Sequence, residues 1–210
     1  MYSIVPTPAH HMSYCRDLRP PENLVNPRLN PVSLETADAP TRELFDSMRP
    51  QARTMNVFRT FAHHPDLMRS WLGFGAYLLR SSTLEPRLRE LVVLRVGWLC
   101  RSPYEWGQHV NLGRKFGVLD ADLTRLTHGP DADGWSAAET AALRATDELI
   151  ERHTLGDATW ADLTRHFSTK QVLDLIFLVG QYQLVAGALN ALRVERDDGL
   201  DASELPFPVP

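Results

Sequence analysis

Three ionisable side chains stand in an unusual setting in the stretch RELVVLRVGWLCRSPYEWGQHV, residues 89–110. Glu90 lies inside an almost continuous apolar run, and Glu105 and His109 follow that run. A buried carboxylate is costly unless it is paired or takes up a proton. Two carboxyl groups and an imidazole in a low-dielectric setting are suited to proton transfer near neutral pH. We therefore take Glu90, Glu105 and His109 as candidate catalytic residues.

The elements that carry these residues are two predicted helices. Pro86 suits the first turn of a helix over residues 86–99, which is apolar on most sides and therefore predicted to be buried. A second helix is expected from Ser102 to a stop at Gly117. Because the connection near residue 101 is short, we expect the helices to be antiparallel. Counted from the turn, the positions of Glu90 and His109 then differ by three residues. This difference is roughly 4.5 Å along the helix axis, a distance that side chains can span.

A structural interpretation competes with the catalytic one. Ser102, Pro103 and Glu105 have the spacing of a capping box, in which the serine and the glutamate satisfy backbone groups at the helix start. Glu105 and His109 share a helix face with Leu112 and Phe116, and that face is expected to point inward. A single histidine on such a face is usually a core residue bonded to a carbonyl. Both interpretations stay open on the sequence alone.

The rest of the chain predicts an all-α domain between extended ends. Six prolines within residues 1–37 predict an extended arm, because proline lacks the amide donor that a helix needs. Residues 38–195 form the expected helical domain, and residues 196–210 are a short tail. Apolar periodicity and cap signals predict helices beginning near Pro40, Asn56, Pro65, Pro86, Pro103, Ser136, Asp157 and Ser168, and no convincing alternating strand occurs.

Composition places the chain among ordinary soluble proteins. Apolar residues make up 43% and charged residues 23%, the net charge is −4, and the arginines are dispersed among acids, so no nucleic-acid partner is expected. The longest apolar stretch, residues 173–192, contains Asp174 and several amides, which favours a buried helix over a membrane span. Two cysteines and the lack of a signal-peptide pattern favour a reduced, cytoplasmic protein.

Other residues have weaker claims to binding roles. Arg95 is a candidate clamp for a substrate carboxylate, although pairing with a buried acid is the stronger interpretation. The pairs His10–His11 and His63–His64 lack further ligands at metal-binding spacing, so we expect no metal and no cofactor. The helical stripe Trp71, Phe74, Tyr77 and Leu78 is expected in the core or at a subunit contact, and would alternatively line a cavity.

A resemblance to a known family is carried by the segment that follows Pro86, RLRELVVLRVGWLCRSPYEWGQHVNLGRKFGV. This segment resembles the carboxymuconolactone decarboxylase-like family within the AhpD-like superfamily. NVFRTFAHHPDLMRSWLGFGAYLL and LIFLVGQYQLVAGALNALRV are similar to the longer members, so the resemblance covers about residues 38–195. It implies an all-α helical bundle, assembly as a homo-oligomer, and a small-molecule pocket around the motif helix.

The resemblance also implies roles for individual residues. AhpD-type peroxidases have a glutamate, a Cys-x-x-Cys pair and a histidine, and these positions correspond to Glu90, Ser102, Glu105 and His109 here. Both thiols are absent, so thiol peroxidase chemistry is not expected. The YEWGQH segment is similar to the decarboxylase-like side of the family, and we add its Tyr104 and Trp106 to Arg95 as candidate substrate-binding residues.

Two functions follow as expectations. The first is an enzyme that uses acid–base chemistry, a decarboxylase or isomerase of a small organic acid or lactone. The second is a non-catalytic helical oligomer or small-molecule-binding protein, in which the polar residues only fix packing. A ligand-sized cavity beside His109 favours the first function, and a filled core around His109 favours the second.

Overall fold

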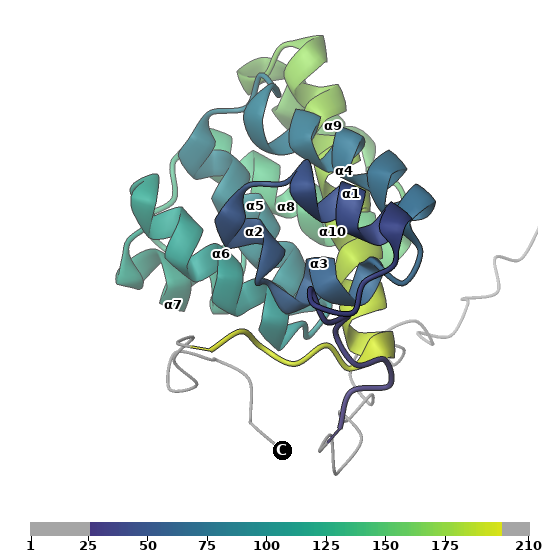
Figure 1. Ribbon diagram of the computed structural model, residues 1–210. Coiled ribbons are helices and arrows are strands. Elements are labelled where there is room, and N and C mark those ends of the chain that lie inside the picture. The colour runs from purple at the N-terminus through teal and green to yellow at the C-terminus, as the bar shows by residue number, and fades with distance from the viewer. Residues whose placement is uncertain (1–25, 199–210) are drawn as a thin grey trace, which may run out of the picture.

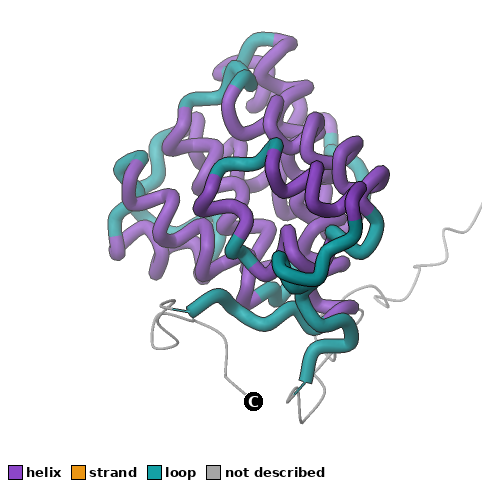
Figure 2. Tube along the Cα trace, in the orientation of Figure 1, coloured by secondary structure: helices purple, strands orange, loops and turns teal. Residues whose placement is uncertain are grey.

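The computed structural model describes residues 26–198, and this part of the chain contains ten α-helices and no β-strand (Figures 1 and 2). The predicted all-α fold class is confirmed. The helices are α1 (Ala39–Asp46), α2 (Pro50–Arg53), α3 (Asn56–Phe61), α4 (Pro65–Arg80), α5 (Pro86–Leu99), α6 (Pro103–Lys115), α7 (Asp120–His128), α8 (Ala137–Arg152), α9 (Asp157–His166) and α10 (Thr169–Leu192).

Local sequence signals explain where most helices begin. Proline occupies the first turn of α1, α2, α4, α5 and α6, where its missing N–H has no helical partner to lose. Ser136 and Ser168 precede α8 and α10 and accept hydrogen bonds from the backbone N–H of Glu139 and Gln171, at 3.3 and 3.4 Å. The Glu139 and Gln171 side chains bond back to the serines, so both predicted capping boxes are confirmed.

Two helices and one helix cap differ from the predictions. The short α2 and the nine-residue α7 were not predicted, because α2 is a single turn and α7 buries only Asp122 and Leu126. The cap of α9 is Gly156, and Asp157 instead lies in the first helical turn. The N–H of Gly156 donates to Glu148 at 2.8 Å. This hydrogen bond holds Gly156 at the cap position, one residue before the predicted cap.

The core is built around α5, which positions the candidate site. Ten of its 14 residues are buried, including Glu90 and Arg95. Helices α6, α7, α8 and α10 pack against it, which accounts for burial on nearly every side (Figure 1). The main hydrophobic cluster joins Val92 and Val96 of α5 to α8 and α10.

Helix α10 is long and apolar enough to cross a membrane by length and composition alone. About 56% of its apolar window is buried inside the protein, as is usual for a core helix. The buried side carries Asp174, Gln181 and Tyr182, whereas Phe177 and Leu184 are exposed. Asp174 accepts hydrogen bonds from Tyr77 and Thr83, and so ties the α4–α5 connection to α10.

Both chain ends contact the helical bundle where they are described. In the arm, the Arg28 N–H donates to the Leu192 carbonyl at 2.9 Å, and the Val32 N–H donates to the Arg59 carbonyl at 3.1 Å. The predicted arm also includes residues 1–25, and Cys15 with them, which lie outside the described residues. The helices lie within the 38–195 interval expected for the domain.

Candidate active site

The α5–α6 hairpin brings Glu90 and His109 into contact. Arg101 turns the chain with a left-handed φ of 50°, and the Ser102 N–H donates to the Gly97 carbonyl at 2.9 Å. The fold-back places Glu90 Oε2 2.7 Å from His109 Nδ1. The contact that the residue offset predicts is therefore present.

Glu90 is completely buried, yet its surroundings favour a carboxylate. Arg89 donates to Glu90 Oε1 through two guanidinium nitrogens, at 3.1 and 3.0 Å. Burial raises the pKa of Glu90, but His109 and Arg89 together outweigh burial and hold this pKa below its ordinary value. An ionised carboxylate only accepts hydrogen bonds, so the His109 Nδ1–H is the donor. In the neutral imidazole with this tautomer, Nε2 is the nitrogen that carries a lone pair.

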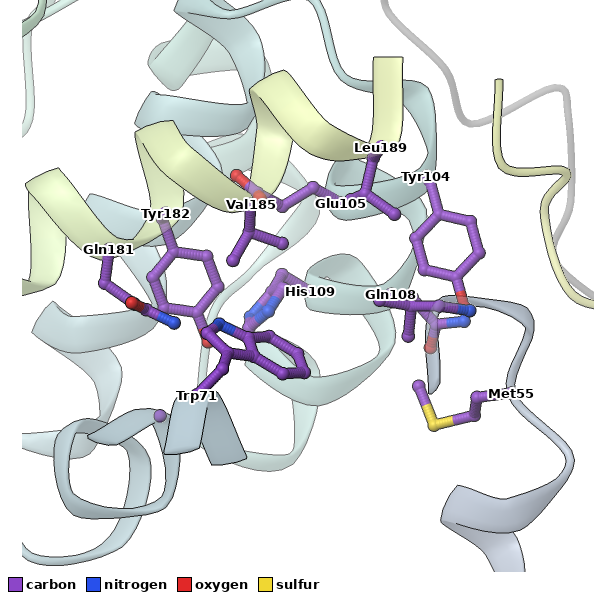
Figure 3. A pocket seen from close by; sticks show the side chains of 12 residues that line it. Met55, Trp71, Tyr104, Glu105, Gln108, His109, Gln181, Tyr182, Val185 and Leu189 are labelled. Atoms are coloured by element: carbon purple, nitrogen blue, oxygen red, sulfur yellow. The ribbon is translucent and has the colours of Figure 1, made fainter. Parts of the chain in front are cut away.

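His109 forms part of the wall of a cavity of about 100 Å³. The ring packs edge-on against Tyr182 of α10, with the ring centres 4.9 Å apart. Figure 3 shows His109 between side chains from α4, α6 and α10. The cavity walls are largely apolar, with contributions from Met55, Val57, Trp71, Val185 and Leu189. The core is therefore not filled at His109.

Glu105 does not form the capping box that its spacing with Ser102 predicts. Ser102 is the N-cap of α6, but its hydroxyl makes no capping hydrogen bond, and both Glu105 oxygens lack a hydrogen-bond partner among the described residues. The carboxyl group lies instead beside Gly97, where a Cβ atom in place of the glycine hydrogen would be 3.6 Å from Oε1. Burial raises the pKa of Glu105 well above its ordinary value. Glu105 also lines the cavity, so all three predicted catalytic residues converge there or adjoin it.

The three predicted substrate-binding residues have different surroundings. Tyr104 lines the cavity. Arg95 does not, because its guanidinium binds both oxygens of Asp147 at 2.7 Å and also donates to the Leu126 carbonyl. This pairing with an acid was the stronger of the two interpretations of Arg95. Trp106 is 1% exposed and packs in a cluster with Leu91, Leu94 and others, away from the cavity wall.

The predicted inward face of α6 is only partly inward. Glu105 and His109 are buried, but Phe116 is 40% exposed. The Arg89 guanidinium lies over the Phe116 ring, 5.1 Å from its centre. Gly117 follows the C-cap Phe116 with a φ of 87°, so α6 ends where the glycine predicted.

Asp197 is a site residue that the sequence did not reveal. Its carboxylate accepts hydrogen bonds from the Tyr104 hydroxyl at 2.8 Å, from the Gln108 amide, and from the Asn56 backbone N–H at 2.7 Å. Asp197 thereby joins the C-terminal segment to α3 and α6 at the edge of the cavity. Burial raises the pKa of Tyr104, and the adjacent Asp197 raises it further, so this phenol stays protonated and remains a donor.

Metal-ligand geometry does not occur within residues 26–198, where no cluster of three or more His, Cys, Asp or Glu side chains could hold an ion. His63 Nε2 contacts the Asn30 carbonyl at 2.9 Å, and His64 caps α4 by accepting from Leu67 N–H. His10 and His11 lie outside the described residues. Cys100 ends α5 and is not among the cavity-lining residues.

Comparison with known proteins places this geometry in a family. Residues 65–148, which include α4, the α5–α6 hairpin and most of α8, match the carboxymuconolactone decarboxylase family. A crystal structure from Ralstonia eutropha JMP134, a peroxidase-related protein with an alkylhydroperoxidase AhpD core, has a similar fold, with a TM-score of 0.72. The chain is thus similar to the carboxymuconolactone decarboxylase family over residues 65–148 and has the fold of the AhpD core. The resemblance inferred from the sequence is confirmed.

Solved structures of similar fold cover nearly the whole helical domain. The Ralstonia protein is 19% identical, over 83% of this chain and 94% of that one. A peroxidase-related protein from Silicibacter sp. TM1040 is 15% identical over 84% and 96%, with a TM-score of 0.70. The debrominase Bmp8, solved with 2,3,4-tribromopyrrole, is 14% identical over 86% and 95%, with a TM-score of 0.64. No curated protein matches the chain.

Proposed function

We propose that this protein belongs to the carboxymuconolactone decarboxylase/AhpD-like superfamily and is an acid–base enzyme that decarboxylates or isomerises a small organic acid or lactone. The observation that carries the proposal is the Glu90–His109 contact of 2.7 Å at the wall of a cavity. A carboxylate that holds one imidazole nitrogen fixes the tautomer and directs the other nitrogen toward a substrate. His109 is the proposed proton-transfer residue, and Glu90 is its positioning partner.

Glu105 supplies a second proton-carrying group in the same cavity. Burial raises the pKa of this carboxyl group well above its ordinary value, which favours the protonated form that can donate a hydrogen bond or a proton. In this proposal Glu105 is the acid, and His109, held by Glu90 through its Nδ1, is the base.

The non-catalytic alternative is less well supported. A histidine that serves only packing is normally enclosed, whereas His109 borders a cavity of about 100 Å³. Both oxygens of the buried Glu105 carboxyl group lack a hydrogen-bond partner among the described residues. For packing alone, an apolar side chain would serve as well and would leave no polar atom unpaired. Thiol peroxidase activity is not proposed, since Ser102 and Glu105 occupy the positions of the paired thiols. A cytoplasmic location stays a prediction.

The reaction class can be tested by nuclear magnetic resonance in D2O. We expect the protein to change at least one compound in a panel of small lactones and organic acids, by loss of CO2, shift of a double bond or uptake of deuterium beside a carbonyl. His109→Gln protein is the control for adventitious activity. If no compound changes and none raises the Tm of the wild-type protein, the packing interpretation holds instead.

We also propose that the protein is a homo-oligomer, with a second copy covering the exposed apolar side of α10 and α4. Phe177 and Leu184 are 55% and 60% exposed on α10, and Phe177 packs edge-on against the exposed Phe74 of α4. Gly180 and Gly187 lie on the same side of α10, and a Cβ atom added at either glycine would meet no other atom within 4 Å. Exposed apolar surface of this kind is typical of a protein–protein contact.

Light scattering tests this assembly. We expect a mass that is a multiple of 23.7 kDa for the wild-type chain and a lower mass for the double variant Phe177→Glu, Leu184→Glu, because four charges would face each other in a symmetric contact. Leu119→Glu is the matched control, since Leu119 is 63% exposed before α7. A wild-type mass near 23.7 kDa at micromolar concentration would contradict the proposal.

A further inference from the structure

The cavity beside His109 is too small, in the form that the structure shows, for a lactone ring. A cavity of about 150 Å³ holds benzene, whereas this cavity measures about 100 Å³. A γ-lactone has at least as many non-hydrogen atoms as benzene. The structure is therefore a closed form with respect to such a molecule, and part of the cavity wall must move before the molecule can reach His109.

The segment that follows α10 lies along two walls of this cavity. We call residues 193–198 the C-terminal strap, which leaves the end of α10 and runs below α3 and α6 in the view of Figure 1. One wall contains Met55 and Val57, which flank the first residue of α3, and another contains Tyr104 and Gln108 of α6. A contact of the strap with both walls would keep them together.

Asp197 provides this contact. One of its carboxylate oxygens accepts a hydrogen bond from the Asn56 backbone N–H of the α3 wall at 2.7 Å. The other oxygen accepts from the Tyr104 hydroxyl of the α6 wall at 2.8 Å, and from the Gln108 amide. The Asn56 side chain also donates to the Glu195 carbonyl at 3.1 Å. Hydrogen bonds to a carboxylate are roughly twice as strong as neutral ones, so Asp197 is the main polar link between the strap and the two walls.

The strap is anchored at its other end by Val194. The Val194 N–H donates to the Leu189 carbonyl at 3.0 Å, and its side chain packs against a cluster that includes Tyr104. Beyond Val194, the hydrogen bonds of the strap to the described part of the chain run to Asn56, Tyr104 and Gln108. Chain ends stay ordered only where such contacts hold them. Loss of the Asp197 contacts would therefore free the strap beyond Val194.

We propose that Asp197 is a specificity-determining residue, whose hydrogen bonds limit the size of the molecules that reach His109. While these bonds hold, the strap keeps the α3 and α6 walls together. When they break, the strap moves away beyond Val194, and the walls separate enough to admit a lactone. Helix α3 packs mainly against α2 and α4, so it can move from α6 without disturbing the core around α5. The inference rests on the proposed function only in taking the cavity as the substrate site.

Thiol reagents of two sizes test this role of Asp197 without any substrate. Val185 lines the cavity, so Val185→Cys in a Cys15→Ser, Cys100→Ser background places a single thiol there. Methyl and benzyl methanethiosulfonate carry the same uncharged reactive group and differ in size. We expect Asp197→Ala to raise the rate constant for the benzyl reagent by about tenfold or more, as the loss of hydrogen bonds to a charged group implies. The rate constant for the methyl reagent should rise less.

Two controls separate opening of the cavity from general loosening. Asp198→Ala removes the neighbouring, exposed acid of the strap and should change neither rate. Ala142→Cys, in place of Val185→Cys, puts the thiol in the core of α8, away from the cavity, where Asp197→Ala should not accelerate its reaction. An unchanged benzyl rate, an equal gain for both reagents, or the same gain at position 142 would overturn the inference. These rates do not depend on turnover, so the acid–base function stands or fails separately in the D2O panel.

Amide exchange of Asn56 tests the same contact in a chain that keeps its native cysteines. Asn56 begins α3, so its N–H has no acceptor within the helix, and Asp197 is its partner. We expect nuclear magnetic resonance to show this amide protected in the wild type and exchanging about tenfold faster or more in Asp197→Ala. Asp197→Asn keeps an acceptor oxygen without the charge and should lie between the two. Exchange at the free-peptide rate in the wild type, or a rate that Asp197→Ala leaves unchanged, would contradict the proposal.

Discussion

Replacing His109 with glutamine should lower the turnover of a responsive substrate by about 10²–10⁴-fold, which is the usual contribution of acid–base catalysis. Glutamine keeps a polar side chain of similar length but has no group that exchanges a proton near neutral pH. The loss should appear in kcat more than in KM if His109 acts in the chemical step. The measurement is the initial rate by magnetic resonance, beside a circular dichroism spectrum that verifies folding.

Glu90→Gln should produce a similar loss through His109. An amide in place of the carboxylate no longer fixes the Nδ1–H tautomer, because glutamine presents a donor as well as an acceptor to the imidazole. The double variant should lose little more than either single variant, since the two residues act as a unit. His166→Gln is the control, because His166 is exposed at the end of α9. Fully additive losses, or a His109→Gln rate within a few fold of wild type, would refute the arrangement.

The free energy of unfolding of the Glu105→Gln protein should increase relative to that of the wild type as the pH rises. Above an ordinary carboxyl pKa near 4.5, the unfolded chain has lost the Glu105 proton, whereas burial raises the pKa of the folded state and keeps the proton there. The folded state then binds more protons, so the free energy of unfolding of the wild type decreases with pH. The decrease is about 1.4 kcal/mol for each pH unit until the folded pKa is reached.

Urea unfolding of both proteins at several pH values between about 5 and 8 measures this effect. The Glu105→Gln curve should be flatter, and the difference in its favour should grow with pH. A capping role would instead make the variant less stable, by about 0.5–2 kcal/mol. Glu151→Gln, at an exposed position on α8, should follow the wild-type curve. A constant difference across the pH range would show that Glu105 is not a buried acid.

The helical architecture was predictable because its signals are local. Proline at the first turn and the serine capping boxes located the starts of α4, α5, α8 and α10, and continuous apolar runs identified α5 and α10 as buried. The short α2 and the weakly buried α7 lack these signals, so their helical state depends on contacts with the rest of the fold. Even the Glu90–His109 contact followed from local information, namely the length of one turn.

Interactions between distant segments were less predictable. The capping-box spacing of Ser102 and Glu105 is a local pattern, but the side chain of Glu105 extends over Gly97 instead. Trp71 was expected in the core or at a subunit contact, with a cavity wall as the alternative, and only the packing of α4 with the rest of the fold shows that it borders the cavity. Asp197 carries no spacing signal at all, because its partners lie 89 to 141 residues away.

The position of Asp197 has a consequence for how the cavity can diversify. Its carboxylate links the edge of the cavity to a segment that follows the last core helix, and Asp197 itself is not part of any hydrophobic cluster. Substitutions of Asp197 can alter the edge of the cavity while the hydrophobic clusters of the bundle keep their side chains. One determinant of the cavity is thereby encoded outside the core helices, so it can change while the packing of those helices is retained.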